Sequence, residues 1–369
     1  MRLALRELRR RPGRFSIATV ILTLVALLLM FLGGLLDGLI NNSVAAITAQ
    51  NADVIVYSAR AENSFVRSRL TATDRAVVEA TPGVTAVGGI GVVQLGARIP
   101  ESGPRDLIDV ALFGYEIAPR GVPDTPGVGE AYADDSLESD GVKPGMTLLI
   151  GPARSPVLII GMVSNTNYLG QGSLWASPAT WREVQNANRP DAFVTDGVFQ
   201  AFVVQGSGGG TELAAAIDRA GGGATLSLTV AAAADKLPGV AQQRTVFNQI
   251  IGVTVVIALV VVALFFALLT IERTGLYGVL KAIGAKSRTL FSGLVLQAVI
   301  VSTIASVIAG GVAITLDAVI PAGALPFELS AGRLLSSVGF LLIAAVLGCA
   351  FSLRRVLHVD PAAAIGNAS

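Results

Sequence analysis

Four long stretches of this sequence carry no charged residue, and they limit the fold more than any other feature. They lie between Arg14 and Asp37, Arg244 and Glu272, Arg288 and Asp317, and Arg333 and Arg354. A helix needs about 20 apolar residues to cross the hydrocarbon core of a membrane, and each stretch is long enough. Only 14% of the residues are charged, against about 25% in soluble domains, which excludes a soluble globular domain and a disordered chain. Because a backbone in lipid must satisfy its own hydrogen bonds, we expect four transmembrane helices.

The first stretch also has features of a signal peptide. A basic start precedes the apolar run, and small residues follow around Ala45–Ala49. Signal peptides, however, have apolar runs of about 7–15 residues, and this run is longer. Three further apolar stretches also follow it. We therefore expect the first stretch to be retained as a membrane span.

Lysine and arginine gather on one side of these spans. Residues 1–14 hold six arginines, the segment 272–288 holds four lysines and arginines, and the tail adds Arg354 and Arg355. The loop after the third span has only Arg333. By the positive-inside rule, both termini and the 272–288 loop face the cytoplasm, in a multi-pass protein of the plasma or inner membrane. Residues 41–244 then lie outside, with 20 acidic against 14 basic residues.

The outer segment is long enough for a folded domain. Runs rich in β-formers predict strands at Ala52–Tyr57, Leu107–Phe113, Thr147–Ile150 and Val157–Val163, of which the last two form a hairpin. Helical patterns lie at Thr73–Ala80, with its first threonine as N-cap, and at Thr211–Ala220. Gly206–Gly210 and Gly221–Gly223 are expected as flexible connections. The mixture predicts an α+β extracytoplasmic domain between the first and second spans.

No catalytic or metal-binding pattern stands out. The sequence has one cysteine, Cys349, which excludes an intramolecular disulfide. It has one histidine, His358, which excludes a multi-histidine metal site. No GxxxxGK[ST] phosphate loop occurs, so we do not expect this chain to bind ATP or to be an enzyme by itself. A net charge of +1 gives no case for nucleic acid. The acidic residues Asp134, Asp135, Glu138 and Asp140 lack the spacing of an EF-hand, so a solvated loop is favoured over a calcium site.

The stretch Glu272–Ser292 directly continues the second span. Its apolar residues recur at helical spacing and form one face: Leu276, Val279, Leu280 and Ile283. Its basic residues lie off that face: Lys281, Lys286 and Arg288. The Gly284-Ala285 pair then allows a turn back into the third span. A short amphipathic helix beside a membrane lies on lipid or docks in a partner's groove, and these residues alone leave both open.

This loop resembles the FtsX/MacB-type ABC-transporter permease family, whose second span ends in a pattern like E-R-x-x-E-[IF]-[GA]-x-[LF]-[KR]-A-[LI]-G-A. The corresponding residues are Glu272, Arg273, Leu276, Tyr277, Gly278, Val279, Leu280, Lys281, Ala282, Ile283, Gly284 and Ala285. Two acids common in the family are absent, since Leu276 and Gln297 stand in their places, so salt bridges made by those acids are in doubt. The tail Val359-Asp360-Pro361-Ala362 resembles the family's closing motif, and the N-terminal segment resembles its amphipathic helix. In size and in the stretch Val54–Leu70 the chain looks most like the DevC and haem-efflux permeases.

The resemblance implies a mechanism. Family members work as homodimers with cytoplasmic ATPase subunits, which bind ATP and Mg²⁺, and this chain itself is expected to hold no cofactor. Closure of the ATPase dimer is transmitted through the loop into the spans, and many members extrude a substrate outside the membrane. By this analogy the matching residues from Glu272 to Ala285 couple the chain to its ATPase. We also hypothesise that Lys281 and Lys286 complement an acidic rim on that ATPase.

The first span carries a second candidate site. Gly34 and Gly38 form a GxxxG pattern, which lets helix backbones approach closely. Met30, Gly34 and Asp37 share a helix face. Ser302, Ser306 and Gly310 form a similar stripe in the third span. Helix packing, including packing across a dimer seam, is the favoured interpretation. The alternative is a ligand face in the outer leaflet, since an acid within a span is a functional hypothesis by default.

Haem is one substrate to weigh, because its iron accepts Met, His, Cys or Tyr. His358 is expected in the cytoplasm and Cys349 in the packed core of the fourth span. Met30 is the only methionine within a span. If Met30 ligates haem, Met30→Leu should abolish any shift in haem absorbance.

The sequence therefore predicts four transmembrane α-helices with a large α+β extracytoplasmic domain between helices one and two. The expected parts are a cytoplasmic amphipathic helix (1–14), spans at 15–40, 245–271, 289–316 and 334–353, the outer domain (41–244), a coupling loop (272–288), an outer loop (317–333) and a cytoplasmic tail (354–369). The expected function is that of an ABC permease that exports or extrudes a hydrophobic or amphipathic substrate. One alternative is a subunit that transmits force to an extracytoplasmic partner, such as a cell-wall hydrolase or a lipoprotein. Another is a membrane sensor without an ATPase.

Overall fold

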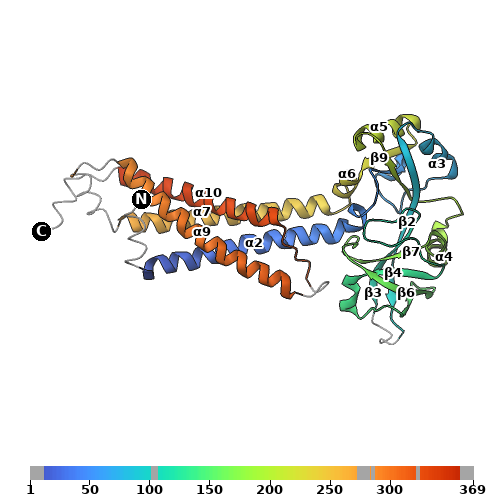
Figure 1. Cartoon of the computed structure of the whole chain (residues 1–369), viewed down its shortest axis with the longest axis horizontal. Helices are drawn as coiled ribbons and strands as arrows, with labels where there is room; N and C mark the ends of the chain where they lie inside the picture. The colour runs from blue at the N-terminus through green and yellow to red at the C-terminus, as the bar shows by residue number, and fades with distance from the viewer. Residues whose placement is uncertain (1–11, 101–106, 272–282, 284–286, 321–324, 358–369) are drawn as a thin grey trace. The chain divides into compact units, whose positions relative to one another are not determined.

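The computed structural model describes residues 12–100, 107–271, 283, 287–320 and 325–357. The chain divides into two compact units (Figure 1). The helical unit comprises Met1–Gly38, Arg244–Ile320 and Phe327–Ser369. The sheet unit comprises Leu39–Gln243 and Pro321–Pro326.

Four helices in the described residues are long and apolar enough to cross a membrane. They are α2 (Pro12–Thr48), α7 (Val240–Ile271), α9 (Ser287–Val319) and α10 (Ala331–Leu357). The predicted fold class, four such helices with a mixed domain between the first two, is confirmed. The helices of the structure continue beyond the predicted spans because an apolar run marks only the part that lipid requires, whereas a helix ends where its backbone hydrogen bonds end.

Small side chains fill the core of the helical unit. The buried face of α9 carries Ala298, Ala305, Ala309 and Ala313, and the buried face of α10 carries Ala344 and Ala345. Residues of this size let helices approach closely where water cannot drive them together. By contrast, much of α7 is exposed and apolar, including Val253, Val256 and Leu264, as expected for a surface in contact with lipid or with another membrane helix.

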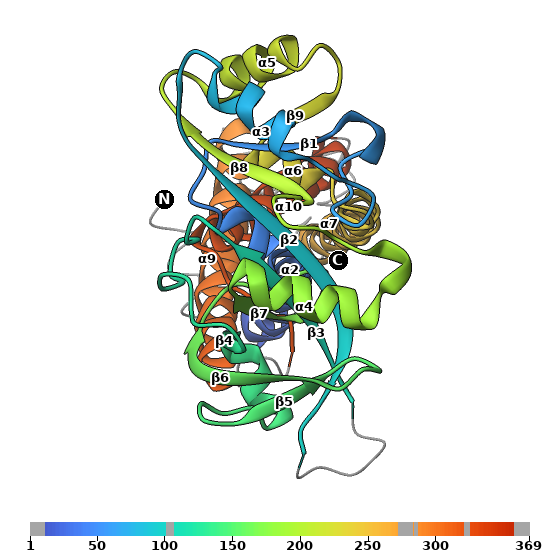
Figure 2. The same cartoon turned by 90° about the vertical axis from the view of Figure 1, so that its right-hand side faces the viewer.

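The sheet unit is built on one nine-stranded mixed sheet, with strand order β3-β7-β4-β6-β5-β2-β8-β1-β9 and a further β3–β2 pairing. Its strands are β1 (Val54–Ser58), β2 (Val84–Arg98), β3 (Ile108–Tyr115), β4 (Glu130–Asp134), β5 (Thr147–Ile150), β6 (Ser155–Val163), β7 (Gly172–Ala176), β8 (Ala201–Gly206) and β9 (Thr225–Thr229). The extra pairing closes a ring through β2, β3, β7, β4, β6 and β5, whereas β8, β1 and β9 extend from the other part of β2 (Figure 2).

In the described residues, four α-helices accompany this sheet: α3 (Ala72–Glu79), α4 (Pro178–Asn188), α5 (Gly210–Ala220) and α6 (Val230–Asp235). Both faces of the central strands are covered. Val54 and Val56 of β1 belong to one buried cluster, and the alternate residues Ile55 and Tyr57 belong to another. A strand buried on both faces has a continuous apolar run rather than alternation, as the sequence of β1 does.

Two glycines of the long strand β2 make room for aromatic rings. A Cβ on Gly89 would collide with the ring of Phe199, and one on Gly91 would collide with the indole of Trp181. Trp181 comes from α4, and the two rings lie parallel with centroids 6.1 Å apart. Glycine weakens a strand by itself, but here it allows bulky rings to pack directly on the backbone.

The predicted strands at 52–57, 107–113, 147–150 and 157–163 correspond to β1, β3, β5 and β6, and β5 pairs antiparallel with β6. The predicted helices correspond to α3 and α5. The N-cap prediction at Thr73 was wrong. Thr71 caps α3, because its hydroxyl accepts from the Asp74 N–H while the Asp74 carboxylate accepts from the Thr71 N–H. Gly210, expected in a flexible connection, is the first residue of α5.

Candidate functional site

Asp37 ends the apolar run of α2, and the start of α10 holds its carboxylate. Arg333 donates from Nε to Asp37 Oδ2 at 3.0 Å and from Nη2 to Asp37 Oδ1. Ser330 Oγ donates to the same Oδ2 at 3.2 Å and accepts from the Arg333 N–H, so Ser330 is the N-cap of α10. The carboxylate therefore meets three donors at a helix N-terminus, where the helix dipole favours negative charge.

Two glycines of α2 make room for this cluster. A Cβ on Gly34 would lie 2.5 Å from Phe327 Cε2, and one on Gly33 would lie 2.9 Å from Arg333 Cγ. The Phe327 ring stacks on Phe31 with centroids 5.5 Å apart, and the Glu328 N–H donates to the Gly34 carbonyl at 3.1 Å. Gly34 thus serves close packing within one chain, and Gly38 is also buried.

Met30 lies within the apolar core of the helical unit. It is 1% exposed and belongs to the same buried cluster as Leu22 and Ala26. The predicted face of Met30, Gly34 and Asp37 is therefore occupied by the chain's own side chains. In this conformation the Met30 thioether is closed to a ligand that approaches from lipid or water. Ser302, Ser306 and Gln297 of α9 are buried as well.

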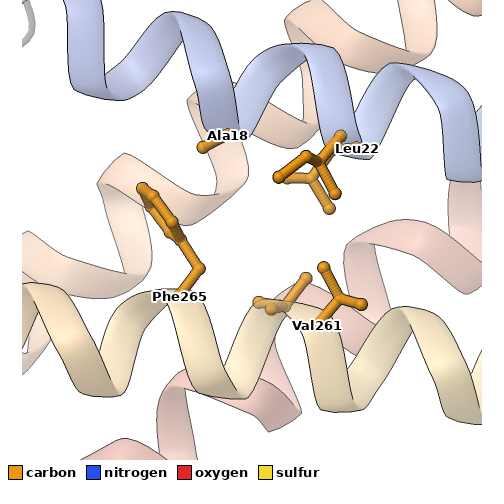
Figure 3. A pocket seen from close by; sticks show the side chains of 6 residues that line it. Ala18, Leu22, Val261 and Phe265 are labelled. Carbon is orange, nitrogen blue, oxygen red and sulfur yellow. The ribbon is translucent and has the colours of Figure 1, made fainter.

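A small apolar cavity lies between α2 and α7. Ala18, Leu22, Val261 and Phe265 line it and point toward one another (Figure 3). Its volume is about 10 Å³, which is close to the space that one water molecule needs. The cavity is a gap in helix packing and is too small for a substrate.

The predicted ATPase-coupling residues fall almost entirely outside the described residues. This holds for Glu272, Arg273, Leu276, Val279, Leu280, Lys281, Ala282, Gly284 and Ala285. Ile283 is described, in a turn, and is 79% exposed. The segment joins α7, which ends at Ile271, to α9, which begins at Ser287. The N-terminal residues 1–11, His358 and the closing Asp360-Pro361-Ala362 motif also lie outside the described residues.

The acidic residues 134–140 do not share one ligand geometry. Asp134 is fully buried, and its Oδ2 accepts from the Thr166 N–H at 2.8 Å and from Thr166 Oγ1 at 2.6 Å. Its other oxygen accepts from the Ser136 N–H at 3.0 Å. Burial, together with the charges of Asp134 and Glu138, raises the pKa of Asp135. Internal donors thus occupy both oxygens of Asp134, and no metal-binding cluster is found among the residues that the structure describes.

Sequence reasoning missed the partners of Asp37, namely Ser330 and Arg333, and the Phe327 ring that packs on Gly34. One signal was available. Arg333 is the only basic residue of the predicted outer loop, and Asp37 is an acid that ends a span on the same predicted side. Opposite charges at the same membrane depth are candidates for pairing because an isolated charge there is costly.

Four apolar helices with a large mixed domain between the first and second define a multi-pass membrane protein. Residues 248–361, from the described part of α7 to beyond α10, match the family model of the FtsX-like permease C-terminal domain. The match covers less than half of the chain, and over these residues the chain is similar to FtsX-like permeases.

Full-length relatives agree with this assignment. The chain is 28% identical over 99% of both chains to an uncharacterized ABC transporter permease of Mycobacterium tuberculosis. It is 35% identical over 127 residues to a putative hemin transport system permease protein, HrtB, of Staphylococcus haemolyticus, a match that spans 34% of this chain and 36% of that protein. The chain is thus a homologue of ABC transporter permeases along nearly its whole length.

Two solved structures also show some likeness. The periplasmic region of MacB from Actinobacillus actinomycetemcomitans matches with a TM-score of 0.34 and 12% identity, over 49% of this chain and 90% of that one. The extracellular domain of the ABC-type transporter YknZ from Gram-positive bacteria matches with a TM-score of 0.31 and 16% identity, over 48% of this chain and all of that one. At these scores the likeness adds nothing to the strand pairings described above.

Proposed function

We propose that this chain is the membrane subunit of an ABC exporter that works with a separate cytoplasmic ATPase. The observation that carries the proposal is the FtsX-like permease domain at 248–361, joined in one chain to a first span and a large folded domain. The sequence holds no phosphate loop, so ATP and Mg²⁺ belong to the partner. The basic residues of 1–14, 272–288 and the tail support placing both termini and the loop in the cytoplasm.

The residues between α7 and α9 are the proposed contact with the ATPase. Both helices are candidate spans, so 272–286 emerges on the side of the membrane where α7 ends. Ile283 is exposed and is therefore accessible to a partner. A homodimer is part of the proposal, and the apolar outer face of α7 supports it as a surface for lipid or a second copy.

The proposed substrate is hydrophobic or amphipathic. Haem is the first compound to test because two kinds of evidence point to it, the predicted resemblance and the name of the HrtB relatives. The buried position of Met30 argues against this thioether as a haem ligand in the present conformation.

The test is purification of the tagged full-length protein in mild detergent, with co-purifying chains identified by mass spectrometry. We expect an ATPase at near one-to-one stoichiometry, and an Ile283→Cys variant should crosslink to it. Cys349 is buried and should stay silent. No ATPase, even after crosslinking at position 283, would contradict the proposal and favour a sensor. A stable extracytoplasmic partner in the same sample would replace export with force transmission.

Charge reversal tests the coupling loop. Lys281→Glu with Lys286→Glu should weaken ATPase binding if these lysines face an acidic rim. The matched control is Lys143→Glu with Lys236→Glu, which reverses two lysines of the sheet unit and should leave binding unchanged. Equal loss in both pairs would show a general charge effect and reject the specific contact.

A further inference from the structure

A polar cavity of about 460 Å³ lies in the sheet unit where β1, α3 and the turn between α5 and β9 meet. These elements are near the top of Figure 2. Its volume is within the range of small-molecule sites, about 300–1,000 Å³. Its lining includes Arg60, Arg69 and Asp74, together with Gly222 and Gly223. These residues come from three separate segments of the chain. The site is independent of the proposed transport function.

The two arginines have no acidic partner in the described part of the chain. Arg69 donates from Nη1 to the carbonyls of Ser68 at 2.8 Å and Val66 at 3.3 Å, which fixes the guanidinium without neutralising it. Arg60 is exposed and makes no hydrogen bond or ion pair with described residues. Nearby Arg67, by contrast, pairs with Glu62 at 2.9 Å.

Partial burial lowers the pKa of Arg69. A lowered pKa means that the guanidinium loses more hydration energy by burial than it regains from the surrounding protein groups. An anion placed beside the guanidinium would supply the missing compensation.

The rest of the lining suits such an anion. Asp74 is the one acid, and its Oδ2 already accepts from the N–H and the hydroxyl of Thr71, both at 2.8 Å. Gly222 and Gly223 adopt φ of 58° and 87°, a region that glycine enters without cost. They leave the backbone bare, and a Cβ on either would meet no atom within 4 Å. The Gly223 N–H has no hydrogen-bond partner among the described residues.

We propose that this cavity binds a phosphoryl group between Arg60 and Arg69. Guanidinium groups match phosphate oxygens with paired hydrogen bonds. Donors that reach the cavity from three segments suit the tetrahedral oxygens of phosphate better than the two coplanar oxygens of a carboxylate. The cavity combines two arginines with one acid, in a segment where acids outnumber bases by 20 to 14.

The experiment uses the full-length chain in phosphatidylcholine nanodiscs at constant ionic strength. Calorimetric titration compares inorganic phosphate, glycerol 1-phosphate and acetate. Loss of a charge-assisted pair at Arg60→Gln or Arg69→Gln should weaken phosphate binding about tenfold or more. The matched control, Arg67→Gln, removes an arginine of the same loop that is paired elsewhere, and should bind as the parent does. Arg60 is exposed and makes no hydrogen bond or ion pair with described residues, so its variant keeps the test valid if Arg69→Gln is unstable.

The source of the phosphoryl group is decided by native mass spectrometry after purification from a membrane that contains anionic phospholipid. Retention of phospholipid by the parent and by Arg67→Gln, but not by Arg60→Gln, assigns the site to a lipid headgroup. Binding of glycerol 1-phosphate without retained lipid assigns it to a soluble ester. The proposal is overturned if phosphate does not bind at millimolar concentration, if acetate binds as tightly, or if Arg67→Gln weakens binding as much as Arg60→Gln.

Discussion

The pair of Asp37 and Arg333 should contribute measurably to the stability of the helical unit. Two charge-assisted hydrogen bonds join them, and their side chains are only 23% and 22% exposed, so water screens the pair weakly. A hydrogen bond to a charged group contributes about 1.5–3 kcal/mol. For a site at the edge of the bundle we take a value in the lower half of this range, about 2 kcal/mol, as the coupling free energy of the pair, which is roughly thirtyfold in the folding equilibrium.

A double-mutant cycle measures this coupling directly. Asp37→Asn and Arg333→Gln are made singly and together, and unfolding is followed by thermal or denaturant titration in one detergent. Either single change should destabilise the protein, and the second should cost much less once the first is present. Separate sites give additive changes within about 0.3–0.5 kcal/mol. Additivity of that quality would refute the view that these two side chains depend on each other.

Three further predictions follow from single positions. Gly34→Ala should lower the melting temperature, because overpacking against Phe327 costs about 1–3 kcal/mol. In the control Gly311→Ala, the new Cβ meets no atom within 4 Å, and the helix propensity of alanine should stabilise the protein by up to about 1 kcal/mol. Equal shifts in melting temperature for the two variants would contradict the packing of Phe327 on Gly34. Asp135→Asn should raise thermal stability at pH 7. The pKa of Asp135 is higher in the folded than in the unfolded state, so stability is lost as the carboxyl ionises with rising pH. The gain in stability from Asp135→Asn should therefore vanish below about pH 3.9, where the carboxyl is neutral in both states. Met30→Leu conserves volume and should cost less than about 1.5 kcal/mol, with any haem absorbance unchanged; loss of that absorbance would make Met30 a ligand.

Local patterns predicted the elements whose own residues decide their structure. The β5–β6 hairpin follows from two runs of β-formers around a turn. The strand β2 was missed because four glycines in 15 residues lower strand propensity. For two of them the reason lies elsewhere in the chain, because the ring of Phe199 packs on Gly89 and the indole of Trp181 packs on Gly91. The helix α4 was missed although it carried a signal, Ser177 as N-cap followed by Pro178.

At the candidate site, too, the sequence pattern did not show which distant residues make contact. Spacing along α2 placed Met30, Gly34 and Asp37 on one face but could not show what covers it. Arg333 lies 296 residues from Asp37, and no helical or strand period connects positions so far apart. The residues that cover this face, Phe327, Ser330 and Arg333, come after α9 in the sequence. Their position in space depends on how the four helices pack.

Asp37 and Arg69 are both charged residues, but they differ as candidates for ligand recognition. Asp37 draws attention because an acid at the end of a membrane span is unusual, yet three donors of its own chain already satisfy its carboxylate. A ligand at Asp37 would first have to displace Arg333 and Ser330, and their lost hydrogen bonds would reduce its affinity. Arg69 lies in an ordinary loop of the sheet unit, but among the described residues its guanidinium donates only to backbone carbonyls. A ligand there would add a missing counter-charge and displace no partner, so the loop arginine is the stronger candidate for recognition.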